Sequence, residues 1–127
     1  MVRISGRVLR GARYGRKLGF PTANLDRRQW TRLKPSPKLW VYAGTAQIKN
    51  PSRKYKAGIV VGPIDNKGLP KIEAYLINFS GNLYGKSLEL ELIKYLRPFH
   101  KYSGEPALKL QIKKDISKVK KLIIKKI

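Results

Sequence analysis

The segment from Lys86 to Ile93 reads KSLELELI, in which leucine alternates with a polar residue. Leu88, Leu90 and Leu92 fall on one face of an extended chain, and Glu89 and Glu91 fall on the other. This period of two predicts a half-buried β-strand whose leucines face a core and whose glutamates face water. The segment therefore indicates a mainly β protein.

Other segments on both sides of this one have strand character. They are Arg3 to Leu9, Trp40 to Ile48, Lys56 to Val61 and Lys71 to Phe79. Turn sequences separate them, at Asn50-Pro51-Ser52, at Gly62-Pro63 and at Ser80-Gly81-Asn82. Several short strands joined by turns predict a small closed or nearly closed barrel, which we expect over about residues 1–100.

The hydrophobic period changes after Ser103. Apolar residues then recur at helical spacing, at Leu108, Ile112, Ile116, Val119 and Ile123. They predict a helix over about residues 104–124, with Ser103 as its cap, Pro106 in its first turn, and Asp115 among its lysines. We favour a helix docked on the barrel by this apolar stripe. The alternative is a lysine-faced helix that lies on a membrane or on RNA.

Length and composition limit the possibilities. A chain of 127 residues that is 42% hydrophobic predicts one domain, residues 1–127, which we expect to be a monomer. Since there is no cysteine, a disulfide framework and a cysteine nucleophile are excluded. No secretory signal and no apolar run of about 20 residues is visible, so we expect a cytoplasmic protein without a membrane partner.

The charge is strongly unbalanced. The 29 basic and 7 acidic residues give a formal net charge of +22, concentrated near the two ends of the sequence. A field of that sign attracts polyanions, so nucleic acid or nucleotide partners are predicted without a choice between them. A basic but merely solvated surface is the alternative.

A glycine-rich basic stretch, GARYGRKLGFPTAN, runs from Gly11 to Asn24. Glycines let backbone N–H groups approach a phosphate, and Arg16 and Lys17 add positive charge. The spacing matches neither a Walker A loop nor a dinucleotide-binding fingerprint. On its own this stretch is more typical of a mobile surface loop.

Three further residues have oxygen atoms that could bind a metal ion or accept a proton. Thr22 and Asn24, two apart on an extended segment, point to the same side and offer the hard oxygen ligands that Mg²⁺ prefers. Hydrogen bonds to the local backbone are the alternative use of these side chains. Glu73 is a rare acid within an apolar strand, which suits it to act as a general base toward a hydroxyl. An ordinary exposed strand glutamate is the alternative there.

Taken together, these segments resemble the riboflavin kinase (flavokinase) family over about residues 5–120. The resemblance begins at Gly6-Arg7-Val8. It continues through GRKLGFPTANL, WVYAG, IEAYLINFSGNLYGKSLELE, YLRP and LKLQIKKDI, in the family's order. It implies a six-stranded antiparallel, Greek-key-like barrel with a C-terminal helix. It also implies a Mg²⁺-dependent transfer of the γ-phosphate of ATP to riboflavin, which yields FMN and ADP.

The resemblance also implies residue roles. Glu73 matches the catalytic carboxylate, and Thr22 and Asn24 match the residues that hold Mg²⁺ and the nucleotide. Further nucleotide contacts match Gly11, Arg16, Lys17, Leu76 and Asn78. The flavin side matches Arg97, His100 and Tyr102, of which His100 and Tyr102 replace the family's more usual Lys and Phe.

Two functional hypotheses follow. The first is a riboflavin kinase which, in the absence of the adenylyltransferase half of bifunctional relatives, makes FMN and not FAD. The second is a kinase-derived protein that binds RNA or the ribosome through its basic surface, with reduced or no activity. The Thr22, Asn24 and Glu73 trio favours the first, because an RNA-binding scaffold has no use for it.

Overall fold

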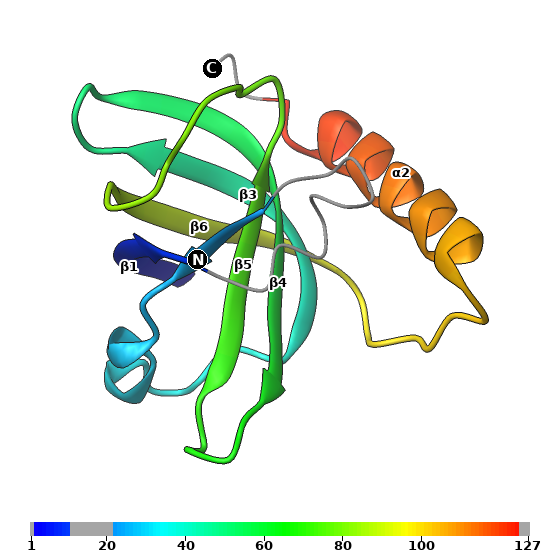
Figure 1. Ribbon diagram of the computed structural model, residues 1–127, viewed down its shortest axis with the longest axis horizontal. Coiled ribbons are helices and arrows are strands. Elements are labelled where there is room, and N and C mark those ends of the chain that lie inside the picture. The colour runs from blue at the N-terminus through cyan, green and yellow to red at the C-terminus, as the bar shows by residue number, and fades with distance from the viewer. Residues whose placement is uncertain (1, 11–21, 125–127) are drawn as a thin grey trace.

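The computed structural model describes residues 2–10 and 22–124. Within them, six antiparallel strands form a closed barrel in the order β1-β2-β5-β4-β3-β6 (Figure 1). The strands are β1 (Val2–Leu9), β2 (Ala23–Leu25), β3 (Trp40–Ile48), β4 (Arg53–Ile64), β5 (Pro70–Leu76) and β6 (Ser87–Arg97). A short 3-10 helix, η1 (Arg28–Arg32), follows β2, and helix α2 (Glu105–Leu122) follows β6.

The connections confirm the predicted Greek-key-like barrel with a C-terminal helix. Strands β3, β4 and β5 are consecutive antiparallel neighbours, and β6 returns to pair with β3 on its other side. This order of β6-β3-β4-β5 is the Greek-key arrangement. Strand β1 pairs with both β6 and β2, and these pairings close the barrel.

The barrel interior is filled by the apolar face of each strand. Leu88, Leu90 and Leu92 of β6 are buried, as their alternation with polar residues predicts. Ile59 of β4 and Ile72 of β5 reach the same core from the opposite wall. The period of two therefore decides which side chains fill the barrel.

A close backbone approach sets the shape of the wall between β3 and β6. The register of these two strands shifts between Ala43 and Gly44. A Cβ atom on Gly44 would lie 1.8 Å from the carbonyl oxygen of Glu91, so no other residue fits there without a shift of the backbone.

Helix α2 packs on the outside of the barrel, against β3 and β4 (Figure 1). Val119 and Ile123 are buried against Ala43 and Ile77, which confirms a helix docked by its apolar stripe. Gly58 of β4 faces this helix, and a Cβ atom there would make an ordinary contact with Val119 Cγ2 at 4.0 Å. No helix in residues 2–10 and 22–124 is long and apolar enough to cross a membrane.

Two expectations about polar residues were wrong, those for Glu91 and Ser103. Glu91 is only 6% exposed, because Thr45, Lys54 and Arg3 surround its carboxylate in the barrel wall. Asp115 is buried as well, at the side of α2 that meets the barrel. Ser103 does not cap α2, whose N-cap is Gly104 with no side-chain hydrogen bond, although the proline does lie in the first turn.

The strand limits differ from the predicted ones where pairing or backbone geometry decides them. β4 and β6 are longer than predicted, because each continues along β3 beyond its own apolar run. β5 ends at Leu76, before the predicted Phe79. Asn78 has a φ of 67°, a left-handed conformation that cannot continue a strand.

Candidate active site

Strand β2 brings two distant parts of the sequence together. It pairs with β1 through Leu9 opposite Asn24, and with β5 through Asn24 opposite Glu73. Ala23 and Ala74, their neighbours along the two strands, are buried in the barrel. Because side chains alternate, Asn24 and Glu73 both lie on the outer face of the barrel.

Within residues 2–10 and 22–124, the Glu73 carboxylate has two side-chain partners. Thr22 Oγ1 lies 3.5 Å from Oε2 and donates to it, and Lys71 Nζ lies 3.0 Å from Oε1. The Glu73 side chain is 25% exposed, so it remains accessible to a substrate hydroxyl. The structure thus groups Thr22, Asn24 and Glu73, as their predicted roles require.

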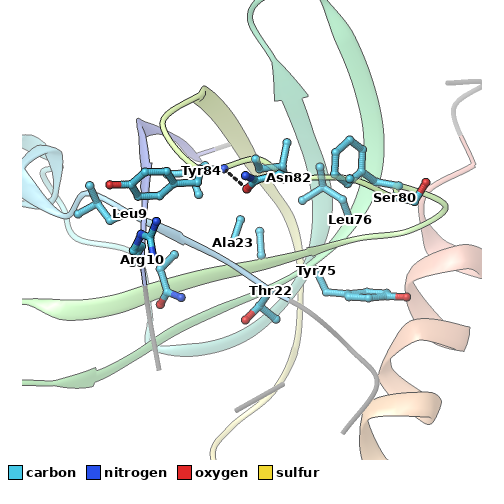
Figure 2. A pocket seen from close by; sticks show the side chains of 15 residues that line it. Leu9, Arg10, Thr22, Ala23, Tyr75, Leu76, Ser80, Asn82 and Tyr84 are labelled. Carbon is cyan, nitrogen blue, oxygen red and sulfur yellow. Dashed lines mark hydrogen bonds between the residues drawn. The ribbon is translucent and has the colours of Figure 1, made fainter. Parts of the chain in front are cut away.

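A cavity of about 410 Å³ opens beside this cluster, between the ends of β1, β2 and β5 and the turn over residues 78–85. Its lining combines apolar side chains with polar groups: Val8, Leu9, Arg10, Thr22, Ala23, Asn24, Ala74, Tyr75, Leu76, Phe79, Ser80, Gly81, Asn82, Leu83 and Tyr84. Figure 2 shows Arg10 and Tyr84 together at one end of it, where the Arg10 guanidinium lies 4.8 Å from the centre of the Tyr84 ring. A cavity that combines apolar walls with polar groups can take a small molecule that has both kinds of surface.

A second cavity, of about 370 Å³, lies along the other part of β5. It shares Leu9, Arg10 and Asn24 with the first, and adds Leu25, Arg27, Pro63, Asp65, Lys71 and Ile72. The Arg27 guanidinium, hydrogen-bonded to Asp65, holds the pKa of that carboxyl below its usual range. On β5, Glu73 falls between the residues that line the two cavities.

The other predicted nucleotide contacts have different surroundings. Leu76 is buried and lines the first cavity, whereas Asn78 is exposed in the turn after β5. Gly11, Arg16 and Lys17 lie outside the described residues.

The residues predicted for the flavin side lie apart from this cluster, and none of the three lines either cavity. The rings of His100 and Tyr102 are in contact, with centroids 4.7 Å apart. Arg97 binds Asp115 of α2 through Nε at 2.9 Å and Nη2 at 2.7 Å, while its Nη1 donates to the Pro98 carbonyl at 3.2 Å. The bond to Asp115 raises the pKa of Arg97. All three guanidinium nitrogens therefore have protein partners.

The donor set fits a magnesium ion. The Thr22 hydroxyl and the Asn24 amide oxygen are hard oxygen ligands, and the Glu73 carboxylate adds negative charge beside them. Within residues 2–10 and 22–124 there is no group of three His, Cys, Asp or Glu residues that could hold a metal by itself. A Mg²⁺ ion at this place would have few protein ligands and would take the rest from phosphate and water oxygens.

Comparison with known proteins decides the family. The profile of the flavokinase family, described as riboflavin kinase, matches residues 1–123. The chain belongs to the riboflavin kinase family. The RNA-binding riboflavin kinase RibR of Bacillus subtilis is 34% identical over 122 residues, which cover 95% of this chain and 51% of that protein.

Two further relatives agree with this membership. A bifunctional riboflavin kinase/FMN adenylyltransferase of Buchnera aphidicola is 38% identical over 122 residues, which cover 93% of this chain and 38% of that protein. The crystal structure of riboflavin kinase from Trypanosoma brucei has a TM-score of 0.68 at 23% identity, over 97% of this chain and 80% of that chain, and shows the shared fold. The chain spans about half or less of the two curated relatives.

Sequence reasoning missed three residues of the site. Lys71 contacts Glu73, and Arg10 and Tyr84 meet at the end of the first cavity. Lys71 had a signal, because residues two apart on a strand share a face. Arg10 and Tyr84 had none, because 73 positions separate them in the chain and only the closure of the barrel brings them together.

Proposed function

We propose that this chain transfers the γ-phosphate of ATP to the ribityl 5′-hydroxyl of riboflavin, giving FMN and ADP. The observation that carries the proposal is the pairing of Asn24 with Glu73, with Thr22 Oγ1 3.5 Å from the Glu73 carboxylate. A metal-binding pair and a carboxylate base, 49 positions or more apart in the sequence, thereby share one surface next to two cavities.

The chain's own residues would mainly position the substrates and neutralise the charge of the phosphates. Ala23, Ala74 and Leu76 provide an apolar wall for a nucleotide base in the first cavity, and Arg10 provides a positive charge near the phosphates. Bound Mg²⁺, held by Thr22 and Asn24, would neutralise charge on the phosphate oxygens. Phosphoryl transfer requires positioning and charge neutralisation above all.

Glu73 would act as the general base. It accepts the proton of the ribityl hydroxyl while that oxygen bonds to the γ-phosphorus and the bond from phosphorus to the departing ADP oxygen breaks. We propose that His100 and Tyr102 contact the isoalloxazine ring. Arg97, held by its bond to Asp115, would support His100 and Tyr102 at the flavin side.

The test is FMN formation by the purified chain with riboflavin, Mg²⁺ and either ATP or CTP. We expect turnover with ATP. Glu73→Gln should lower kcat on the order of 10²- to 10⁴-fold, because it removes the proton acceptor without changing the size of the side chain.

Glu89→Gln is the matched control. Glu89 is also a strand glutamate with a lysine partner, Lys49 at 3.4 Å, and its side chain is 30% exposed. It lies on β6, and it lines neither cavity. It should keep the wild-type rate. No FMN from the wild-type chain, or equal rates for wild type and Glu73→Gln, would contradict the proposed reaction.

A specific feature supports contact with RNA as a second candidate function. Six lysines of α2 are exposed, and none of them forms an ion pair within the described residues: Lys109, Lys113, Lys114, Lys118, Lys120 and Lys121. Since the apolar stripe packs on the barrel, these lysines face outward. One relative bears an RNA-binding name, and we propose that this lysine face of α2 contacts the phosphates of RNA. RNA binding that survives neutralisation of this face would count against it.

A further inference from the structure

Lys71 and Glu73 form an ion pair within one strand. They are two residues apart on β5, so both side chains project from the outer face of the barrel. Lys71 Nζ lies 3.0 Å from Glu73 Oε1, and the two side chains are 42% and 25% exposed.

Among the described residues, the pair leaves one Glu73 carboxylate oxygen with only a weak contact. Glu73 Oε1 is occupied by Lys71, while Oε2 has the Thr22 hydroxyl at 3.5 Å, the limit of a hydrogen bond. If the Thr22 hydroxyl binds a metal ion instead of Glu73, Lys71 is the side chain among the described residues that still holds the Glu73 carboxylate in place. Its hold on Oε1 would leave Oε2 open to a proton from a substrate hydroxyl.

Most ion pairs at this degree of exposure contribute little to stability. The Lys71–Glu73 pair differs in location from the Lys49–Glu89 pair. Lys49 lies in the β3–β4 turn and Glu89 lies on β6, both outside the candidate site. Lys71 lines the second cavity, and its partner stands opposite Asn24. Small displacements of a catalytic group carry large costs in rate, so a contact of little value for stability can matter for turnover.

We propose that Lys71 is a positioning residue that holds the Glu73 carboxylate with Oε2 directed toward the acceptor hydroxyl. This role rests on the proposed function, in which Glu73 is the base. The competing role for a lysine in this cavity is direct contact with a phosphate of the nucleotide. The two roles predict different kinetics.

The first arm of the test compares single variants under saturating ATP, Mg²⁺ and riboflavin. Lys71→Met should lower kcat about tenfold or more and leave KM for ATP within about twofold, because it disturbs the base and not nucleotide binding. Lys71→Arg should recover most of the rate, since it restores a cation next to Oε1. Lys67→Met, at an exposed lysine of the β4–β5 turn, is the matched control and should behave as wild type.

The second arm is a double-mutant cycle with Glu73→Gln. If Lys71 acts through Glu73, Lys71→Met should cause no further loss in the Glu73→Gln background. Losses that multiply, or a Lys71→Met variant that raises KM for ATP at constant kcat, would overturn the positioning role in favour of phosphate contact.

The two proposals fail in different ways. Wild-type turnover together with an unchanged Lys71→Met variant would overturn the positioning role alone. Absence of wild-type turnover would overturn both the reaction and the role of Lys71.

Discussion

Glu91 is held in the barrel wall by three side chains. Thr45 Oγ1 donates to its Oε1 at 2.9 Å, Lys54 Nζ lies 3.0 Å from the same atom, and Arg3 Nε donates to Oε2 at 3.2 Å. The bond from Lys54, with help from Thr45 and Arg3, holds the pKa of Glu91 below its usual value of 4.5 in spite of burial. Stabilisation of the ionised form in this way links folding to pH.

Replacement of this carboxylate should cost stability in a pH-dependent way. A lowered folded-state pKa means that the contribution is present above the unfolded pKa, near 4.5, and is lost as pH falls through the folded value. Glu91→Gln should therefore lower the free energy of unfolding by about 1–2 kcal/mol at pH 7. The difference from wild type should shrink as the pH falls below 4.5. Urea denaturation at pH 7 and at acid pH measures this, and a difference that grows toward acid pH would refute it.

At the level of elements, an ion pair joins β6 to α2 beside the apolar contacts of the helix. Arg97 at the end of β6 binds both oxygens of Asp115, and Gln111 Nε2 donates to Oδ1 of the same carboxylate at 2.9 Å. The two side chains are 20% and 12% exposed. The pair ties the end of β6 to the middle of α2, on either side of the segment that carries His100 and Tyr102.

Replacement of Asp115 alone should lower the free energy of unfolding more than replacement of both Arg97 and Asp115. Asp115→Leu leaves a largely buried guanidinium without its partner and should lower the free energy of unfolding by about 3 kcal/mol. Arg97→Met combined with Asp115→Leu should recover part of this loss, because no unpaired charge remains. Lys118→Met, on the exposed face of α2, should stay within about 0.5 kcal/mol of wild type. A double variant less stable than Asp115→Leu would show that the pair is not the cause.

At the level of the whole molecule, part of the excess positive charge lies on one exposed surface, the lysine face of α2. Seven acidic residues offset 29 basic ones, and the lysine face of α2 has no acidic partner among the described residues. Lys114, Lys118 and Lys121 follow one another at spacings of four and three, so they form a single row along the helix. Such a row suits a polyphosphate chain.

Neutralisation of that row should change the salt dependence of RNA binding. Replacement of Lys114, Lys118 and Lys121 by Gln should reduce the slope of log K against log salt by about 2 for single-stranded RNA. The matched control replaces Lys34, Lys67 and Lys86, three exposed lysines of separate loops, and changes the net charge equally. Equal slopes for the two triple variants, measured by fluorescence anisotropy, would show that total charge and not this face governs binding.

Local patterns predicted the elements because their causes are local. Alternating leucines in β6 and the helical stripe of α2 bury one face each, and the structure confirms both. The same alternation predicts that Glu91 faces water, and this prediction was wrong. A glutamate on the outer face of a strand faces water only if no neighbour covers it, and Lys54 and Arg3 come from β4 and β1. Strand β2, with three residues, is too short to show a period at all.

For the candidate site, residue chemistry was predictable and proximity was not. The sequence predicts Thr22 and Asn24 as oxygen ligands and Glu73 as a base, and the resemblance to the riboflavin kinase family joins these predictions. The hold of Asp115 on Arg97 was not foreseen, because it depends on how α2 lies on the barrel.

By itself, then, the sequence determined the β class, the C-terminal helix, the family and the chemical types of the site residues, since periodicity and motifs are written along the chain. Only the tertiary structure decided that Asn24 stands opposite Glu73, that Arg10 meets Tyr84, and that the glutamates of KSLELELI have different surroundings. The physical reason is strand register: it is set by the packing of the whole barrel, and it decides which distant side chains meet.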